Sequence, residues 1–326
     1  MDSLKPIQKY EGMVDPQQRP RYTGIASFFR APHTEDLTDV DVGLIGVPYD
    51  GGVTHRSGAR HGPKAVRDQS SMLRRFHATS GFNPFEAARV RDLGDCWIEF
   101  PYALEGALEE IETFYKKIVA AGVTPVSCGG DHSISYPILK AVGRDGPVGM
   151  IHIDAHCDTG DDYLGSRFHH GAPFRRAVEA GVLDPKRTIQ IGIRGTKMAL
   201  DHWGFSETSG MRVLDMDEFQ DKGWAYAVEE ARRVVGDGPV YLSYDIDSLD
   251  PAEAPGTGTP EAGGIRAIEA LRLLRGLSGL DFVGGDLVEV APSWDNGTIT
   301  SFNGATILFE ILCLVTDARV RRGSGA

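Results

Sequence analysis

Residues 148–158 read VGMIHIDAHCD, an apolar run that passes directly into alternating acidic and imidazole side chains. An unbroken apolar run of this length is typical of a strand buried on both faces of a parallel sheet. Because successive side chains of an extended strand point to opposite faces, Asp154, His156 and Asp158 are expected to share one face. Open α/β sheets build their sites at the carboxyl ends of strands, so this segment predicts a polar site there.

Two further runs end in the same manner. The run VYLSY at 240–244 leads into Asp245 and Asp247, again two residues apart. The run TPVSC at 124–128 stops at two glycines that permit a tight turn, and His132 follows them. All three runs therefore predict polar side chains at the same edge of the sheet.

Together these segments supply four carboxylates and two imidazoles. The candidate metal ligands are His132, Asp154, His156, Asp158, Asp245 and Asp247. This oxygen-rich set without thiolate suits Mn²⁺ or a similar octahedral ion better than structural zinc. Two ions that share bridging carboxylates are the economical arrangement. The simpler interpretation, solvated strand ends and a loop histidine, needs three independent coincidences.

The rest of the chain alternates short apolar runs with helical patterns, which predicts βα units around a parallel sheet. We expect strands at 42–47, 123–128, 148–153, 188–193 and 240–244, and helices at 63–76, 104–121, 135–142, 226–235, 265–277 and 306–315. A chain of 326 residues could form one large α/β domain or two smaller ones. The absence of a composition break favours a single domain over 1–326, with an irregular arm at 1–22 and a flexible tail at 319–326.

Composition narrows the class of protein. A formal net charge of −12 and a pI near 5.3 disfavour nucleic acid and anionic membranes as partners. The four cysteines are scattered without a C-x-x-C pair, and neither a signal peptide nor an apolar run of membrane-spanning length is expected. The predicted location is the cytoplasm.

The motif series resembles that of the ureohydrolases, the arginase and agmatinase family. The resemblance rests on GGDHS at 129–133, IDAHCDT at 153–159, HGAPF at 170–174, DIDSLDP at 245–251 and GTGTP at 256–260, in the order typical of the family. It extends from GVPYD at 46–50 to VEV at 288–290. The resemblance implies a three-layer α/β/α fold with a mainly parallel sheet, a homo-oligomer of three or six subunits, and hydrolysis of a small guanidino compound to urea and an amine.

The resemblance also implies how the ligands divide. His132 and Asp158 would complete the set of one Mn²⁺, His156 and Asp247 that of a second, with Asp154 and Asp245 bridging; Ni²⁺ is the alternative ion. Two such cations lower the pKa of a shared water, which supplies the nucleophile.

Three residues are predicted to act in catalysis. Asp158 would accept a proton from the nucleophile and pass it to the departing nitrogen. His170, which aligns with the family's His-Gly-x-Pro motif, would shuttle protons, although His169 competes for that role. Glu289, at the end of an apolar run, would bind the guanidinium through two parallel hydrogen bonds. A loop histidine and a solvated strand-end glutamate are the simpler interpretations.

The loop at 161–168 is expected to select the substrate. Tyr163 resembles the tyrosine that guanidinopropionases place in this loop, and Arg167 is a candidate partner for a substrate carboxylate. Both favour a short guanidino acid such as 3-guanidinopropionate or 4-guanidinobutyrate. The alternatives are agmatine, another guanidine or a biguanide, a formiminoglutamate hydrolase, a deacetylase-like zinc enzyme, and a non-catalytic partner subunit.

Overall fold

The computed structural model describes residue 17, residues 20–197 and residues 203–324. Within these residues, eight strands form one sheet in the order β2-β1-β3-β8-β7-β4-β5-β6, and every neighbouring pair is parallel. The strands are β1 (Val42–Val47), β2 (Val90–Asp95), β3 (Thr124–Gly129), β4 (Val148–Ile153), β5 (Leu183–Ile193), β6 (Arg212–Asp215), β7 (Val240–Asp245) and β8 (Phe282–Val288).

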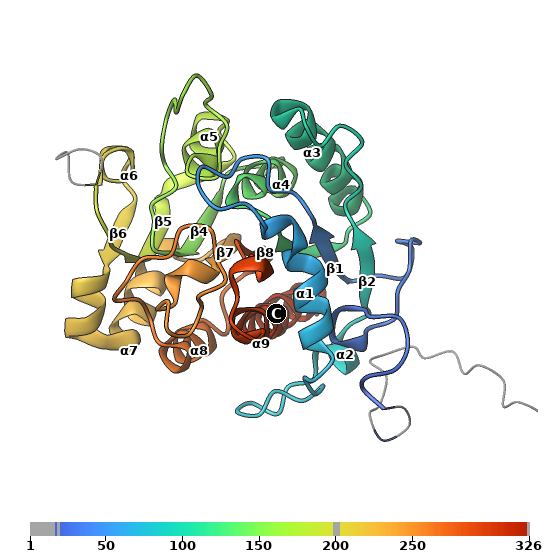
Figure 1. The fold of residues 1–326 in the computed structure, drawn as a ribbon. Coiled ribbons are helices and arrows are strands. Elements are labelled where there is room, and N and C mark those ends of the chain that lie inside the picture. The colour runs from blue at the N-terminus through green and yellow to red at the C-terminus, as the bar shows by residue number, and fades with distance from the viewer. Residues whose placement is uncertain (1–16, 18–19, 198–202, 325–326) are drawn as a thin grey trace, which may run out of the picture.

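Helices cover both faces of the sheet, with α3, α4 and α5 on one side and α1, α7, α8 and α9 on the other (Figure 1). The α-helices are α1 (Gly62–Ser70), α2 (Pro84–Ala87), α3 (Leu104–Ala120), α4 (Ser135–Val142), α5 (Pro173–Glu179), α6 (Phe205–Ser209), α7 (Met216–Val235), α8 (Ala267–Gly276) and α9 (Ile299–Gly323). Short 3₁₀ turns are η1 (Phe28–Arg30), η2 (Ala59–His61), η3 (His132–Ile134), η4 (Ile246–Ser248) and η5 (Pro292–Trp294). The predicted three-layer α/β/α architecture is therefore confirmed.

The inner strands owe their continuous apolar sequences to helices on both sides. Every residue of β3, β4 and β7 is buried. In β4, Met150 packs in the cluster beneath α3 and α4, whereas its neighbour Ile151 packs in the cluster beneath α7 and α9. Truncating a fully buried residue such as Ile151 to alanine would cost about 2–5 kcal/mol, because it leaves a cavity in one layer.

Strand order decides where the polar segments meet. The strands β3, β8, β7 and β4 are consecutive neighbours at the centre of the sheet. Their registers align Cys128 with Leu287, and Asp245 with Val288. Because all four strands run in the same direction, the residues that follow their carboxyl ends emerge side by side. The fold thus gathers the candidate ligands at one edge.

Three strands were absent from the predicted set. One is the inner strand β8, whose apolar run is interrupted by Gly284, Gly285 and Asp286; the other two are at the edges of the sheet. The segment Val90–Asp95 forms β2 and Arg212–Asp215 forms β6. Edge strands face neighbours on one side only and tolerate polar residues, so they do not show the apolar run used to find the inner strands. Asp92 of β2 is buried because it pairs with Arg67 of α1 at 3.1 Å.

Two helices are longer than their sequence patterns indicated. The segment α7 begins at Met216, ten residues before the predicted start, because Asp215 caps its first turn by accepting from the Glu218 N–H at 2.9 Å. Gly223, at φ 82°, interrupts the helical geometry inside it, which hid the first half of the pattern. The last helix, α9, spans Ile299–Gly323 and so includes residues 319–323 of the predicted flexible tail. Most of the predicted arm at 1–22 lies outside the described residues.

The helix α9 corrects one further expectation. Its length and apolar composition would allow it to cross a membrane, although no such run was expected. However, 78% of its most apolar window is buried inside the fold, where it packs against β8 and α1. Its apolar character is therefore accounted for by its position as the central helix of one layer (Figure 1).

Candidate active site

The carboxyl ends of the central strands bring six predicted ligands into two adjoining groups. In the first group, His132 Nδ1 lies 2.9 Å from Asp158 Oδ2, 3.1 Å from Asp245 Oδ2 and 3.2 Å from Asp154 Oδ2. His132 begins η3 after the Gly129–Gly130 turn, where a Cβ on Gly130 would approach the Tyr49 carbonyl oxygen to 1.5 Å. Only glycine permits that close approach, so the turn that positions His132 depends on it.

The second group consists of Asp154, His156 and Asp247. His156 Nδ1 lies 3.1 Å from Asp247 Oδ2 and 3.5 Å from Asp154 Oδ1. Asp154 therefore belongs to both groups and offers a different oxygen to each. Asp245 belongs only to the first group, with His132, Asp154 and Asp158, so its bridging role, which the family resemblance implies, stays a prediction.

Hydrogen bonding fixes the proton of His132 away from the cluster. The Ser243 hydroxyl donates to Asp286 Oδ1 at 2.7 Å, so its oxygen accepts from His132 Nε2 at 2.9 Å. In the neutral ring this leaves the Nδ1 lone pair facing three carboxylate oxygens, without a hydrogen-bond partner among the described residues. Burial lowers the pKa of His132, but the three surrounding carboxylates outweigh that effect and hold it well above the ordinary value. A cation between these atoms removes the conflict.

The spacing of the ligand atoms fits an octahedral ion. With bonds of about 2.1 Å, neighbouring ligands of an octahedral ion lie roughly 3.0 Å apart. The three distances from His132 Nδ1 are 2.9, 3.1 and 3.2 Å. Imidazole nitrogen with carboxylate oxygen is also a donor set that suits Mn²⁺. The first group thus fits a divalent cation by both chemistry and spacing.

Beside the ligands, His170 and Glu289 form a buried pair. His170 Nδ1 lies 2.8 Å from Glu289 Oε1, and the same oxygen accepts from the His132 backbone N–H at 2.9 Å. At the other end of the ring, His170 Nε2 accepts from the Thr54 backbone N–H at 3.2 Å and lies 2.7 Å from the Thr54 hydroxyl. Burial lowers the pKa of His170, but the negative charge of Glu289 prevails and raises it to about 9. The raised pKa favours the protonated ring near neutral pH, with the Nδ1 hydrogen directed to Glu289 Oε1.

The second oxygen of Glu289 has a different environment. Glu289 Oε2 is buried and has no hydrogen-bond partner among the described residues. A Cβ on Gly258 would lie 3.4 Å from it, so the missing side chain at Gly258 leaves that oxygen open on one side. Because Oε1 already accepts two hydrogen bonds, only Oε2 remains for a ligand. In the predicted pairing, the substrate guanidinium donates to both oxygens of Glu289. Because Oε1 is already occupied, that pairing lacks a second free acceptor oxygen.

Asp158 and Glu289 also share a strained backbone. Their φ angles are +50° and +64°, in the left-handed region that residues other than glycine seldom adopt. Glu289 directly follows β8, and Asp158 lies in the loop five residues after the end of β4. Strain of this kind costs about 1–3 kcal/mol and is retained where the surrounding structure determines the conformation. Here it turns both carboxylates towards the cluster.

Two cavities meet at this edge of the sheet. One, of about 320 Å³, is lined by Thr54, His156, Asp158, Gly160, Tyr163, His169, His170, Gly171, Asp245 and Thr259. The other, of about 420 Å³, shares His156 and Asp158 with it and is bordered by Arg175, Arg194 and Lys197. The two cavities therefore adjoin at the metal-ligand groups, and the second has a cationic border.

The two predicted specificity residues occupy different positions. Tyr163 lines the smaller cavity, as expected for a substrate-contacting side chain. Arg167 is absent from the lining of both cavities; its guanidinium bonds to Asp161 at 3.3 Å and Glu179 at 2.8 Å. The structure thus brings Tyr163, but not Arg167, to the cluster.

Several supporting residues were not singled out from the sequence. Asp131 Oδ2 accepts from the Gly52 N–H at 2.7 Å and holds the loop that carries Thr54. Burial, followed by the nearby Glu289 charge, raises the pKa of Asp131 to about 6. Asp286 is a carboxylate inside the apolar run of β8, a signal that could have indicated a buried partner. Thr54 and Ser243 gave no comparable signal.

Cys157, which occupies a position between ligands, does not add a thiolate. Burial raises the pKa of its thiol to about 12, so it stays protonated at neutral pH. All four cysteines are free. This agrees with a ligand set made only of carboxylate and imidazole.

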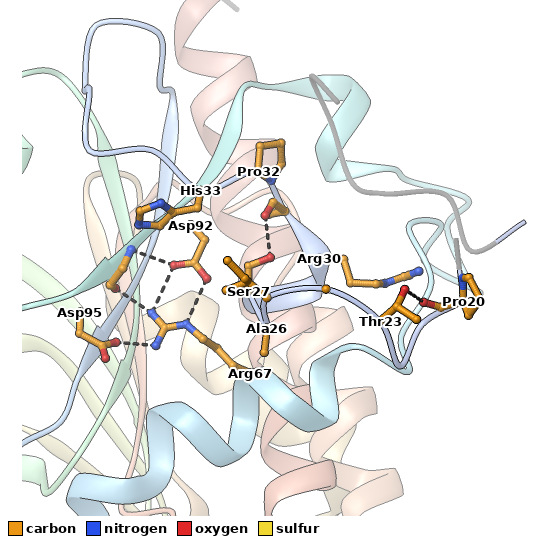
Figure 2. A pocket seen from close by; sticks show the side chains of 14 residues that line it. Pro20, Thr23, Ala26, Ser27, Arg30, Pro32, His33, Arg67, Asp92 and Asp95 are labelled. Atoms are coloured by element: carbon orange, nitrogen blue, oxygen red, sulfur yellow. Dashed lines mark hydrogen bonds and ion pairs between the residues drawn. The ribbon is translucent and has the colours of Figure 1, made fainter. Parts of the chain in front are cut away.

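A further cavity of about 500 Å³ lies at one edge of the sheet, between residues 20–33 and the edge strand β2 (Figure 2). Its charged groups are mostly paired with each other, since Arg67 bonds to Asp92 at 3.1 Å and to Asp95 at 2.5 Å. None of the predicted ligands lines it. The chemistry of the molecule is therefore concentrated at the central strands.

Comparison with known proteins agrees with this geometry. A model of the arginase family matches residues 40–314. Guanidinopropionase of Pseudomonas aeruginosa is 51% identical over 309 residues, which cover 94% of this chain and 97% of that protein. The mitochondrial guanidino acid hydrolase of Homo sapiens is 45% identical and covers 90% of this chain, which in turn covers 83% of that protein.

A solved structure extends the likeness to three dimensions. The proclavaminate amidino hydrolase from Streptomyces clavuligerus superposes with a TM-score of 0.88 at 38% identity, over 92% of this chain and 99% of that chain. Family model, relatives and structure cover most of the chain and agree with one another. The chain belongs to the arginase family.

Proposed function

We propose that this arginase-family hydrolase uses two Mn²⁺ ions to cleave the guanidinium group of a short guanidino acid, releasing urea and an amino acid. One observation carries the proposal: a single cavity is lined by His156 of one ligand group, by Asp158 and Asp245 of the other, and by His170. A substrate held there would contact both groups and a protonated histidine together.

The described residues have distinct parts in this reaction. Bound divalent cations supply Lewis acidity and lower the pKa of water towards neutrality. Glu289 Oε2, buried and without a partner, accepts a hydrogen bond from the substrate guanidinium. Water adds to the guanidinium carbon, Asp158 accepts the proton released, and the carbon–nitrogen bond to the amine breaks. His170, which lines the same cavity, transfers a proton to the departing amine.

The proposal of an acid substrate rests on the cationic border of the second cavity and on the relatives. Arg175 is paired with Asp161 at 2.9 Å, and Arg194 donates to backbone carbonyls such as that of Asp247 at 2.7 Å. Lys197 Nζ lies 3.6 Å from the centre of the Trp203 ring, with its charge available to an anion. A guanidino acid would place its guanidinium at the ligand groups and its carboxylate towards this border. The names of the two relatives above also describe guanidino acids.

A urea-release assay tests the function directly. The purified protein would be loaded with Mn²⁺ or Ni²⁺ and offered guanidinoacetate, 3-guanidinopropionate, 4-guanidinobutyrate, arginine, agmatine, guanidine and a biguanide. We expect the highest kcat/KM with Mn²⁺ and a three- or four-carbon guanidino acid. A higher kcat/KM for agmatine, whose tail is cationic, would reject the acid. No urea from any guanidine would reject the function.

The assembly and compartment are proposed on sequence grounds. The family resemblance implies a homo-oligomer of three or six subunits, and the scattered free cysteines fit the cytoplasm. Sedimentation velocity of the purified chain tests the first proposal, because a monomeric species that is fully active would reject it. Fractionation of the source cells tests the second.

A further inference from the structure

A chain of buried hydrogen bonds leads from the neighbouring strand to the shared ligand Asp154. It begins at Gln190 of β5, whose side-chain nitrogen lies 2.6 Å from the Cys157 carbonyl oxygen and 3.0 Å from His152 Nδ1. A carbonyl oxygen can only accept, so the Gln190 nitrogen must face it. The opposite amide orientation would bring two oxygens within 2.6 Å of each other.

This amide orientation determines which ring nitrogen of His152 carries the hydrogen. The Gln190 amide donates one hydrogen to Cys157 and directs its other hydrogen to His152 Nδ1, which therefore accepts. The ring hydrogen then lies on Nε2, which is 2.7 Å from Asp154 Oδ2. His152 is fully buried in β4, so water does not compete for either nitrogen.

The Asp154 carboxylate is held at both oxygens. Oδ2 accepts from His152, and Oδ1 accepts from the His156 backbone N–H at 2.7 Å. Each oxygen also faces one ligand group, with Oδ2 3.2 Å from His132 Nδ1 and Oδ1 3.5 Å from His156 Nδ1. One lone pair of each oxygen is thus occupied, and the remaining lone pairs point in different directions.

Aromatic packing fixes the ring of His152 as well. The Phe174 ring lies 4.4 Å from His152 and 5.1 Å from His132, measured between ring centroids. The two histidine rings are 5.2 Å apart, so the three rings contact one another. Rotation of His152 would require all three to move.

We propose that His152 and Gln190 are positioning residues that set Asp154 to bridge two metal ions. The ligand atoms of His152, His132 and Asp154 lie within 4.8 Å of one another, but in this role the Nε2 hydrogen of His152 is directed to Asp154 and His152 binds no ion itself. The carboxylate is fixed by hydrogen bonds that run from Gln190 to His152 and from His152 to Asp154. Partners of metal ligands commonly contribute 10- to 100-fold to metal affinity. This inference rests on the metal-dependent function proposed above.

Mn²⁺ affinity, measured by competition with a chelator of known affinity, separates this role from general stability. His152→Phe keeps the ring but loses the donor, and we expect Mn²⁺ affinity to fall by about 10- to 100-fold. His152→Gln places an amide donor near the original Nε2, and we expect it to recover most of that loss. Electron paramagnetic resonance of loaded protein should show coupled Mn²⁺ pairs in the wild type and in His152→Gln, and mainly uncoupled Mn²⁺ in His152→Phe.

Tyr115→Phe is the matched control, because it also removes one buried hydrogen bond, 2.7 Å to Ser127, away from the ligands. We expect it to lower stability in urea without changing Mn²⁺ affinity. If His152→Phe is recovered unfolded, His152→Met takes its place in the comparison with His152→Gln. Methionine and glutamine side chains have nearly the same length, but only glutamine supplies a hydrogen-bond donor.

The possible failures are distinguishable. Wild-type Mn²⁺ affinity in His152→Phe, or an equal loss in His152→Gln, would overturn the positioning role. A wild-type protein that bound no Mn²⁺ would instead overturn the metal-dependent function itself.

Discussion

Glu289 Oε1 and His170 Nδ1 lie 2.8 Å apart, in a pair that links the end of β8 to the loop after β4. The contact uses one oxygen of the carboxylate and leaves Oε2 buried without a partner among the described residues. The residues proposed as proton donor and guanidinium acceptor are therefore held together by one hydrogen bond, and changes at either residue should affect the other.

Replacing Glu289 by glutamine should impair both binding and turnover. The amide keeps the size of the side chain but removes the negative charge from Oε2 and from the contact with His170. A hydrogen bond to a charged group contributes about 1.5–3 kcal/mol, so kcat/KM should fall roughly 10- to 150-fold. Steady-state kinetics with the preferred guanidino acid measure this. Unchanged KM and kcat would exclude Glu289 as the guanidinium acceptor.

His170→Asn should reduce turnover while the ions remain bound. The variant loses the ionisable ring, and general acid–base groups commonly contribute about 10²- to 10⁴-fold to rate. His170 is not in either ligand group, so metal content should stay at two per chain. Elemental analysis alongside kinetics checks both parts. Near-normal turnover would assign the proton transfer elsewhere, and loss of metal would indicate a structural role.

Variants at Asp154 and His156 should differ in how many metal ions the protein retains. Because Asp154 belongs to both ligand groups, Asp154→Asn should weaken both ions, whereas His156→Asn should weaken one. Stoichiometry after dialysis against limiting Mn²⁺ measures the difference. Equal metal content in the two variants would contradict the shared position of Asp154. Full chelation of the wild type should abolish urea release, and Mn²⁺ should restore it.

The contribution of His170 to stability should depend on pH in a defined direction. Its pKa in the fold is raised to about 9, above the value of about 6.5 for an unfolded histidine. A raised pKa means that protonation favours the folded state, so the stabilisation is complete below pH 6.5 and is lost as pH rises through about 9. The difference in urea unfolding free energy between wild type and His170→Asn should shrink accordingly. A free-energy difference that grew as pH rose would mean that folding lowers the pKa of His170, and it would contradict this prediction.

Gly258→Ala should raise KM more than it changes stability. A Cβ there would lie 3.1 Å from the Arg56 carbonyl oxygen and 3.4 Å from Glu289 Oε2, so it would narrow the approach to that oxygen. Gly106→Ala is the matched control, because its Cβ would meet only Ala103 at 3.7 Å in helix α3. The control should stabilise the helix by up to about 1 kcal/mol without changing KM. Equal KM in the two variants would exclude Gly258 from the substrate path.

Most inner strands of the fold were predictable because the physics that determines them is local, and β8 was the exception. The runs that became β1, β3, β4 and β7 are buried on both faces, and this requirement appears directly as consecutive apolar residues. The edge strands β2 and β6 carry polar residues whose burial depends on partners distant in sequence, such as Arg67 for Asp92. Their pairing could not be inferred from the segments themselves.

The residues of the candidate site likewise divide into those that the sequence predicted and those that it did not. All six candidate ligands follow strands that the sequence identified, so their convergence followed from strand direction. Arg167 was assigned from its place in a loop, and loop position does not say which carboxylate a guanidinium will bind. His152 and Gln190 were missed because a polar residue inside a buried strand gives no indication of its partner until strand order is known.

The separation between the strand ends and the loop at 161–168 has a consequence for how this enzyme can be changed. The six candidate ligands and Glu289 follow strands of the sheet, whereas Tyr163 stands on a surface loop between β4 and α5. A library of variants restricted to that loop would sample new tails on the guanidine while every member inherited an intact hydrolytic centre.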